Sequence, residues 1–130
     1  MAEANGWALA RGLTQGCIYL YGLFENIKDL PEDVKLLIAE VEILLNVSKS
    51  IEAQLKAAVL GGVSPEADFR PALEQCVHTI TSLKNEVAED IARYRLKGFV
   101  SKQNESMEKW LFQIEQTKRQ AQIVLLKLGL

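Results

Sequence analysis

The chain has 130 residues, a formal net charge of −2 and two cysteines, and 48% of its residues are hydrophobic while 25% are charged. This length and balance fit one globular domain, and the weakly acidic charge argues against a dedicated nucleic-acid binder, which is normally strongly basic. Cys17 and Cys76 form no CxxC pair, so we expect two buried free thiols in the reducing cytoplasm.

The first predicted helix covers residues 4–28 and contains an unusual stretch, because residues 12–24 carry no charge and hold three of the eight glycines. Ala4, Ala8, Gly12 and Gly16 repeat every four residues, which places small residues along one helix face. Glycine costs about 1 kcal/mol relative to alanine inside a helix, so this stripe needs a compensating reason. Two reasons stay open: close backbone approach to another helix, or a segment that leaves the bundle for a membrane or a partner.

The uncharged stretch is too short for a conventional membrane span, which needs about 20 apolar residues, and Arg11 lies at its edge. We therefore predict a helix that is buried at rest and released under some condition, rather than a permanent anchor. The residues predicted to form this membrane or oligomerisation segment are Leu9, Gly12, Leu13, Gly16, Ile18, Leu20, Gly22, Leu23 and Phe24.

Three further helices are predicted over residues 31–60, 71–96 and 102–128, where apolar residues recur three and four positions apart. The link between the first two helices is the shortest, so we expect these two to form a hairpin. The predicted fold is an all-α, antiparallel bundle of four helices, with five as the alternative, in a single domain covering residues 1–130.

The last predicted helix has a basic outer side. Residues 97–130 contain six lysines and arginines against three glutamates. Cations near a membrane surface attract anionic lipid by about 1 kcal/mol each, although a solvated helix face explains the same pattern. The basic residues predicted to face lipid are Lys109, Lys118, Arg119 and Lys127.

The residues that enzymes and metal sites require are missing from the pattern. His78 is the only histidine, and no nucleophile is marked for it. The neighbouring carboxylates of the second and third helices have the spacing of a solvated helix surface, and no glycine loop of the phosphate-binding type is present. We therefore expect no catalytic residues, no cofactor and no metal, and hence a protein that is not an enzyme.

The order of segments resembles a known family. The stretch GLTQGCIYLYGLFENI runs into DLPEDVKLLIAEVEILLNVSKSIEAQL, then into ALEQCVHTITSLKNEV with an early cysteine, and the last helix ends in VLLKLGL. This pattern is similar to the HeLo-like and Ses-type N-terminal domains of fungal STAND proteins, the fungal counterparts of NOD-like receptors. The resemblance covers nearly the whole chain.

The resemblance implies a helical-bundle effector of programmed cell death. Such a domain is expected to form homo-oligomers and, on activation, to associate with anionic membranes through its N-terminal helix, under the control of a fused or separate NTPase module. Neither that module nor an amyloid motif is present in this chain. The alternative is a helical interaction module that oligomerises without entering lipid, and a third reading is a small-molecule-binding bundle with a cavity lined by Trp7, Tyr19, Tyr21 or Trp110.

Overall fold

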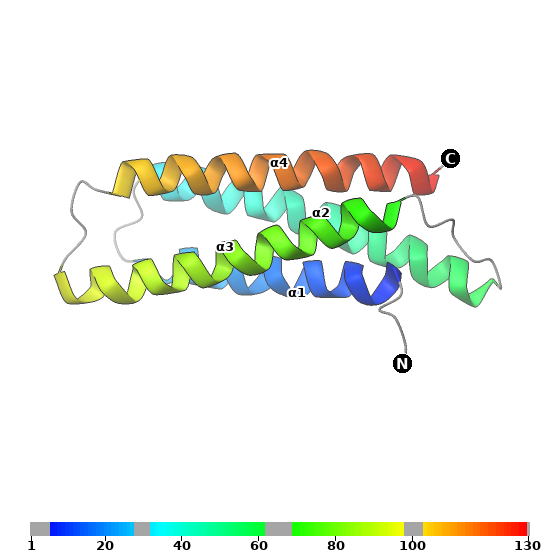
Figure 1. Cartoon of the computed structure of the whole chain (residues 1–130), viewed down its shortest axis with the longest axis horizontal. Coiled ribbons are helices and arrows are strands. Elements are labelled where there is room, and N and C mark those ends of the chain that lie inside the picture. Colours follow the sequence, from blue (N-terminus) through cyan, green and yellow to red (C-terminus); the bar gives the residue numbers. More distant parts are fainter. Residues whose placement is uncertain (1–5, 28–31, 62–68, 98–102, 130) are drawn as a thin grey trace.

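The computed structural model describes residues 6–27, 32–61, 69–97 and 103–129. These residues form an all-α bundle of four helices, as the sequence predicts. The helices are α1 (Gly6–Glu25), α2 (Glu32–Leu60), α3 (Arg70–Lys97) and α4 (Gln103–Gly129). Figure 1 shows the four long helices lying side by side.

The helix ends agree with the predicted ranges to within a few residues, except at the end of α1. The helix was expected to continue to residue 28, but it ends at Glu25. The Ile27 amide donates to the Phe24 carbonyl at 3.2 Å, and this tight turn brings the Ile27 side chain into the core. Residues 4, 5, 28, 31 and 102 of the predicted helices lie outside the described residues.

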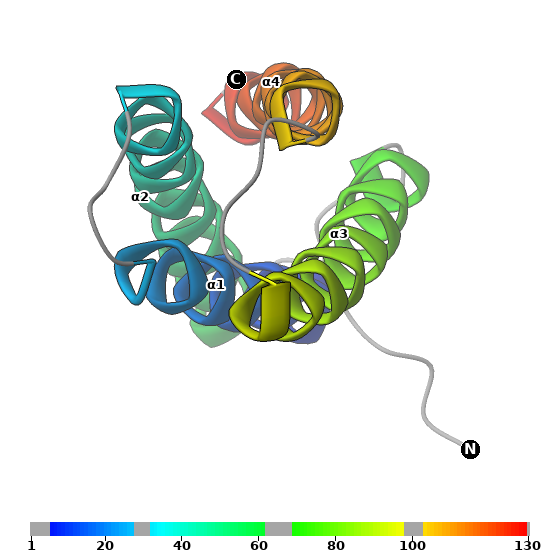
Figure 2. The ribbon, with the colours of Figure 1, turned by 90° about the vertical axis from the view of Figure 1, so that its left-hand side faces the viewer.

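Helices that follow one another in the chain run antiparallel, but two of the neighbouring pairs in space are parallel. The main packing partners are α1 with α2 and α3, and α4 with α2 and α3. Gly6 lies against Phe69, and Gly16 lies against Ile80, so α1 and α3 run the same way. Figure 2 shows the resulting ring, with α1 opposite α4 and α2 opposite α3.

An ion pair links the second parallel pair of helices. The Lys118 ammonium lies 2.6 Å from a Glu40 carboxylate oxygen, and the side chains of Lys118 and Glu40 are 20% and 15% exposed. By contrast, the pair of Lys109 with Glu86, between α3 and α4, spans 3.3 Å with side chains 60% and 36% exposed. The pair between α2 and α4 is the shorter and better shielded of the two, so removing one of its partners would leave a mostly buried charge unpaired.

The core runs along the axis of the bundle and takes residues from all four helices. Phe24 of α1 and Trp110 of α4 meet across the ring, with their ring centroids 6.0 Å apart. The other large side chains that are fully buried are Leu13, Leu20, Val34, Leu37, Leu44, Ile51, Leu55, Leu73, Ile80, Leu83 and Ile114.

The predicted small-residue stripe of α1 is only partly responsible for close packing. A β-carbon at Gly16 would lie 2.8 Å from the Ile80 Cγ2 methyl, whereas one at Gly12 would be 4.0 Å from Val77. Ala8 is exposed, and Ala4 lies outside the described residues. A second tight position, Gly6, does not belong to the stripe, and a β-carbon there would lie 2.9 Å from the Phe69 ring.

We predict that Gly16→Ala is less stable than the control Gly22→Ala by about 1–3 kcal/mol in urea unfolding, the usual cost of overpacking. The two changes share the same gain in helix propensity, but a β-carbon at Gly22 would meet nothing within 4 Å. The Ile80 methyl cannot swing away freely, because it is attached to the β-carbon of a branched side chain. Equal stabilities would show that α1 and α3 are not held at this distance.

Candidate functional site: the buried face of α1

Helix α1 lies against α2 on one side and against α3 on the other. Its exposed positions include Arg11, Gln15, Ile18 and Tyr19, so one side of the helix faces solvent. The face that it turns toward the bundle consists of Ala10, Leu13, Thr14, Gly16, Cys17, Leu20 and Phe24. Four of the nine residues of the predicted membrane segment therefore lie in the core of this structure.

The individual segment residues fall into three groups. Leu13, Gly16, Leu20 and Phe24 are buried. A second group is half-buried and consists of Leu9, Gly12, Gly22 and Leu23. Only Ile18 is well exposed, at 53%. The buried group contains the bulky side chains of Leu13, Leu20 and Phe24. These side chains can contact a membrane only after α1 separates from the bundle.

Hydroxyl groups connect α1 to α2 inside this apolar face. The Thr14 and Ser48 oxygens are 2.6 Å apart, and both side chains are buried. The Ser48 hydroxyl also lies 3.2 Å from the Ala10 carbonyl, and the Thr14 hydroxyl lies 3.0 Å from that same carbonyl. Glu52, the outermost member, accepts from Thr14 at 3.2 Å. We call Thr14, Ser48 and Glu52 the α1–α2 polar contact.

Each hydroxyl in this contact can donate its proton to an available acceptor. Each hydroxyl has one proton, so Ser48 can donate to the Ala10 carbonyl while Thr14 donates to Ser48 or Glu52. Every arrangement leaves each hydroxyl with a partner, and a buried hydroxyl without one would cost about 1–3 kcal/mol. The polar contact thus fixes the register of α1 on α2, which apolar packing alone sets less sharply.

The two cysteines lie in the core beside this face, and both are free. Burial raises the pKa of the Cys17 thiol to about 12, with a further contribution from Cys76. Burial likewise raises the pKa of Cys76 to about 11, and its sulfur lies 3.8 Å from the Thr117 carbonyl of α4. Both thiols are therefore protonated and shielded at neutral pH, as expected for structural cysteines.

The exposed side of α1 carries two aromatic rings with cations above them. The Arg11 guanidinium lies 5.5 Å from the centroid of the Trp7 ring, and the Lys84 ammonium lies 5.3 Å from that of Tyr19. Cation–π contacts at exposed sites are worth about 0.5–1 kcal/mol. Arg11 is thus at the surface, on the side of α1 away from the core, and does not interrupt the buried face.

The four basic residues predicted to face lipid do not form one surface. Lys118 lies in the mostly buried ion pair with Glu40, because its position on α4 faces α2. In this conformation it is not available to lipid. Lys109 is exposed but paired with Glu86. Arg119 and Lys127 are exposed and have no ion pair within the described part of the chain.

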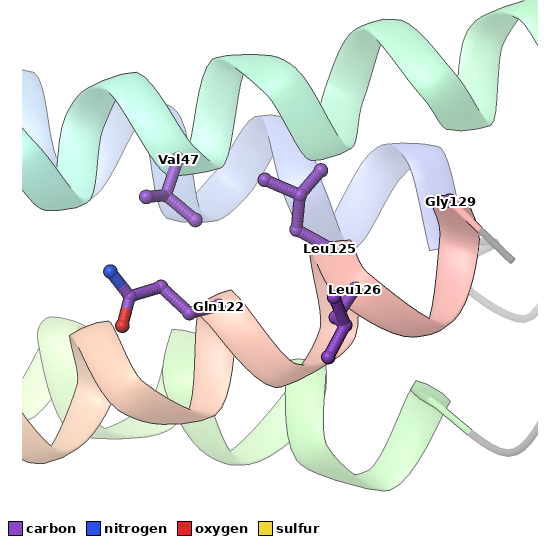
Figure 3. Close-up of a pocket in the computed structure, with 5 residues that line it drawn as sticks. All are labelled: Val47, Gln122, Leu125, Leu126 and Gly129. Carbon is purple, nitrogen blue, oxygen red and sulfur yellow. The ribbon is translucent and has the colours of Figure 1, made fainter.

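A shallow apolar groove of about 390 Å³ lies between α2 and α4. Figure 3 shows Gln122 and Leu125 of α4 reaching toward Val47 of α2, and Leu126 and Gly129 of α4 complete the lining. None of the four aromatic residues proposed for a ligand cavity lines this groove. Trp110, one of the four, is buried in the core.

Neither a metal cluster nor a membrane-spanning helix is found within residues 6–27, 32–61, 69–97 and 103–129. No three His, Cys, Asp or Glu side chains there are grouped so that they could hold a metal ion. None of the helices there is both long enough and apolar enough to cross a bilayer. Comparison with protein-family models, curated sequences and solved structures finds no match for this chain.

The polar contact was missed by reasoning from sequence, although a signal for it exists. Ser48 occupies an inward position of α2, between the buried Leu44 and Ile51, where an aliphatic residue is expected. A polar residue at such a position needs a buried hydrogen-bond partner. The sequence does not say which helix faces Ser48, so it could not identify Thr14 as that partner. The Lys118–Glu40 pair was missed for the same reason.

We predict that Ser48→Ala lowers the free energy of unfolding by about 1 kcal/mol relative to the control Ser50→Ala, as is typical for a buried hydrogen bond. Both are serine-to-alanine changes on α2, but the Ser50 hydroxyl is exposed and donates to the Asn46 carbonyl of its own helix. Amide hydrogen exchange in α1 should also accelerate in Ser48→Ala alone. Equal exchange in both variants would mean that the contact does not hold α1.

Proposed function

We propose that this chain is a non-enzymatic effector domain of the HeLo-like type, which forms homo-oligomers and meets anionic membranes through α1. The observation that carries the proposal is the position of the uncharged segment. Leu13, Leu20 and Phe24 of this segment lie on the inner face of α1, which is held in the bundle by a close approach at Gly16 and by one small polar contact. The site of action would be the cytoplasmic face of a membrane, reached conditionally, with control by a fused or separate NTPase module.

The dimensions of the segment favour partial rather than complete insertion. Residues 12–24 form about 20 Å of helix at 1.5 Å per residue, whereas a hydrocarbon core is about 30 Å thick. Such a helix would lie in the interface or enter one leaflet, or it would need several copies to perturb the bilayer. This proposal therefore joins membrane association to oligomerisation.

The structure selects a better test residue than the buried ones. Leu20 is fully buried and Gly16 abuts Ile80, so a charge at either position would disturb the resting bundle as well as any inserted state. Ile18 is 53% exposed, and its replacement leaves the core intact. Leu60 of α2, at 79% exposed, provides a control outside α1.

We predict that the wild-type chain releases dye from anionic vesicles, that Ile18→Lys strongly reduces the release and that Leu60→Lys retains it. A cation costs about 2.5–3.5 kcal/mol at the bilayer centre and less toward the interface, so insertion of α1 should fall by up to ~100-fold. Circular dichroism and thermal melts check that both variants keep the fold. If the wild type releases no dye in any oligomeric state, the membrane mechanism is wrong. A stable oligomer that does not float with vesicles would favour the interaction module instead.

Departure of α1 from the bundle has a separate chemical readout. The variant Cys17→Ala leaves Cys76 of α3 as the only thiol, and this thiol stays in the bundle when α1 departs. Because burial raises the pKa of Cys76 to about 11, we predict slow maleimide labelling at pH 8 in solution. Anionic vesicles should accelerate labelling at least ~100-fold, because departure of α1 exposes Cys76 to water and lowers its pKa toward the ordinary value near 8.5. Zwitterionic vesicles are the control, and equally slow labelling with both vesicle types would show that α1 stays in place.

A further inference from the structure

The outer surface of α2 and α4 exposes more large apolar side chains than the rest of the described bundle. Of the eight exposed large hydrophobic residues, six belong to these two helices, and one of the six, Leu60, is the last residue of α2. We call the other five the α2–α4 face: Leu36, Ile43, Phe112, Ile123 and Leu126. Exposed apolar clusters on soluble domains commonly mark interaction sites.

The two residues from α2 lie on the side of that helix that borders α4. Leu36 is one turn before Glu40, which pairs with Lys118 of α4. Ile43 is one turn before Val47, which lines the groove with Leu125. Side chains four positions apart share a helix face, so Leu36 and Ile43 extend the surface of α4 rather than forming a separate patch.

The residues from α4 follow its outermost line. Phe112 and Leu126 lie seven positions to either side of Arg119, and all three are exposed. Figures 1 and 2 show the other three helices on one side of α4, so its outer side is uncovered by them. Glu115, one turn before Arg119, and Arg119 itself have no ion pair in the described part of the chain.

We propose that the α2–α4 face binds the same face of a second copy of this chain, with the two α4 helices antiparallel. A two-fold axis at the level of Thr117 and Lys118 places Phe112 opposite Ile123 of the second copy. The same axis brings Glu115 close to Arg119 of the second copy, and symmetry repeats both contacts. An isologous interface requires this kind of self-complementarity, with apolar residues facing apolar ones and each charge facing its opposite.

The charge pattern favours a second copy over lipid as the occupant. Glu115 lies beside Arg119 on this surface, and Glu108 is also exposed. A surface that binds anionic lipid gains from its cations but is opposed by such carboxylates, whereas an antiparallel copy uses both signs. The inference rests on the oligomerisation part of the proposed function and specifies its surface, but it does not involve α1.

Charge reversal gives a test that depends on the register. In Glu115→Arg the facing pairs become two arginine–arginine contacts, and in Arg119→Glu they become two glutamate–glutamate contacts. We expect each variant alone to dimerise at least ~10-fold more weakly than the wild type in sedimentation equilibrium, because like charges now face each other. An equimolar mixture of the two variants should recover the wild-type dimer, since both facing pairs are again of opposite charge.

Matched controls exist on α3 and α1. Glu89 and Arg93 have the same types and the same four-residue spacing on the exposed surface of α3, so Glu89→Arg and Arg93→Glu should leave the dimer unchanged. Ile123→Ser should weaken it at least ~10-fold, whereas Ile18→Ser, at nearly the same exposure (54% against 53%), should not. These controls distinguish dimerisation through the α2–α4 face from nonspecific association of exposed apolar residues.

Three outcomes would overturn the inference: a wild-type chain that stays monomeric at millimolar concentration, single variants that dimerise normally, or a mixture that fails to recover. Loss of vesicle flotation in Arg119→Glu without any change in mass would also overturn it, by showing a lipid-binding surface. If the wild type is monomeric but still releases dye, the dimer proposal is wrong and the membrane role of α1 is retained. If the wild type dimerises but releases no dye, the dimer proposal is supported and the membrane role of α1 is wrong.

Discussion

The position of α1 depends on a side chain that is missing. Because Gly16 has no β-carbon, the Ile80 methyl of α3 packs directly on the α1 backbone, 2.8 Å from the point that a β-carbon would occupy. On its other side α1 is held by Thr14 against Ser48 of α2. These two contacts place the helix between α2 and α3, and the burial of Leu20 and the other bulky residues of its inner face follows from that placement.

The members of the polar contact differ in whether they keep a hydrogen-bond partner when α1 moves. The Thr14 hydroxyl lies 3.0 Å from the Ala10 carbonyl one turn earlier in its own helix, so it keeps a partner wherever α1 goes. Ser48 and Glu52 stay behind on α2, where water can reach them once α1 has gone. The helix therefore carries no buried hydroxyl without a partner into an apolar environment, and the cost of separating it is mainly the loss of close packing.

The sequence was a good guide to the helices and a poor guide to their neighbours. Periodicity located four helices because α2, α3 and α4 are plainly amphipathic, and the short first link correctly indicated an α1–α2 hairpin. The pattern of residues within a helix does not say which helix lies opposite, so the inward position of Lys118 and the partners of Ser48 were out of reach. The four-residue stripe was only partly right for a related reason: of its members Gly16 is a point of close approach and Gly12 is not, whereas Gly6, outside the stripe, lies against Phe69.

The parallel pairing of α2 with α4 has a consequence for how the chain folds. Glu40 and Lys118 are separated by 78 positions in the chain, and all of α3 lies between their two helices in sequence. Contacts of this kind form only after a long segment has been closed into a loop, which costs entropy before any packing is gained. Two-state folding rates fall as the average sequence separation of contacts rises, so this bundle should fold more slowly than one in which each helix packs only on its predecessor and successor.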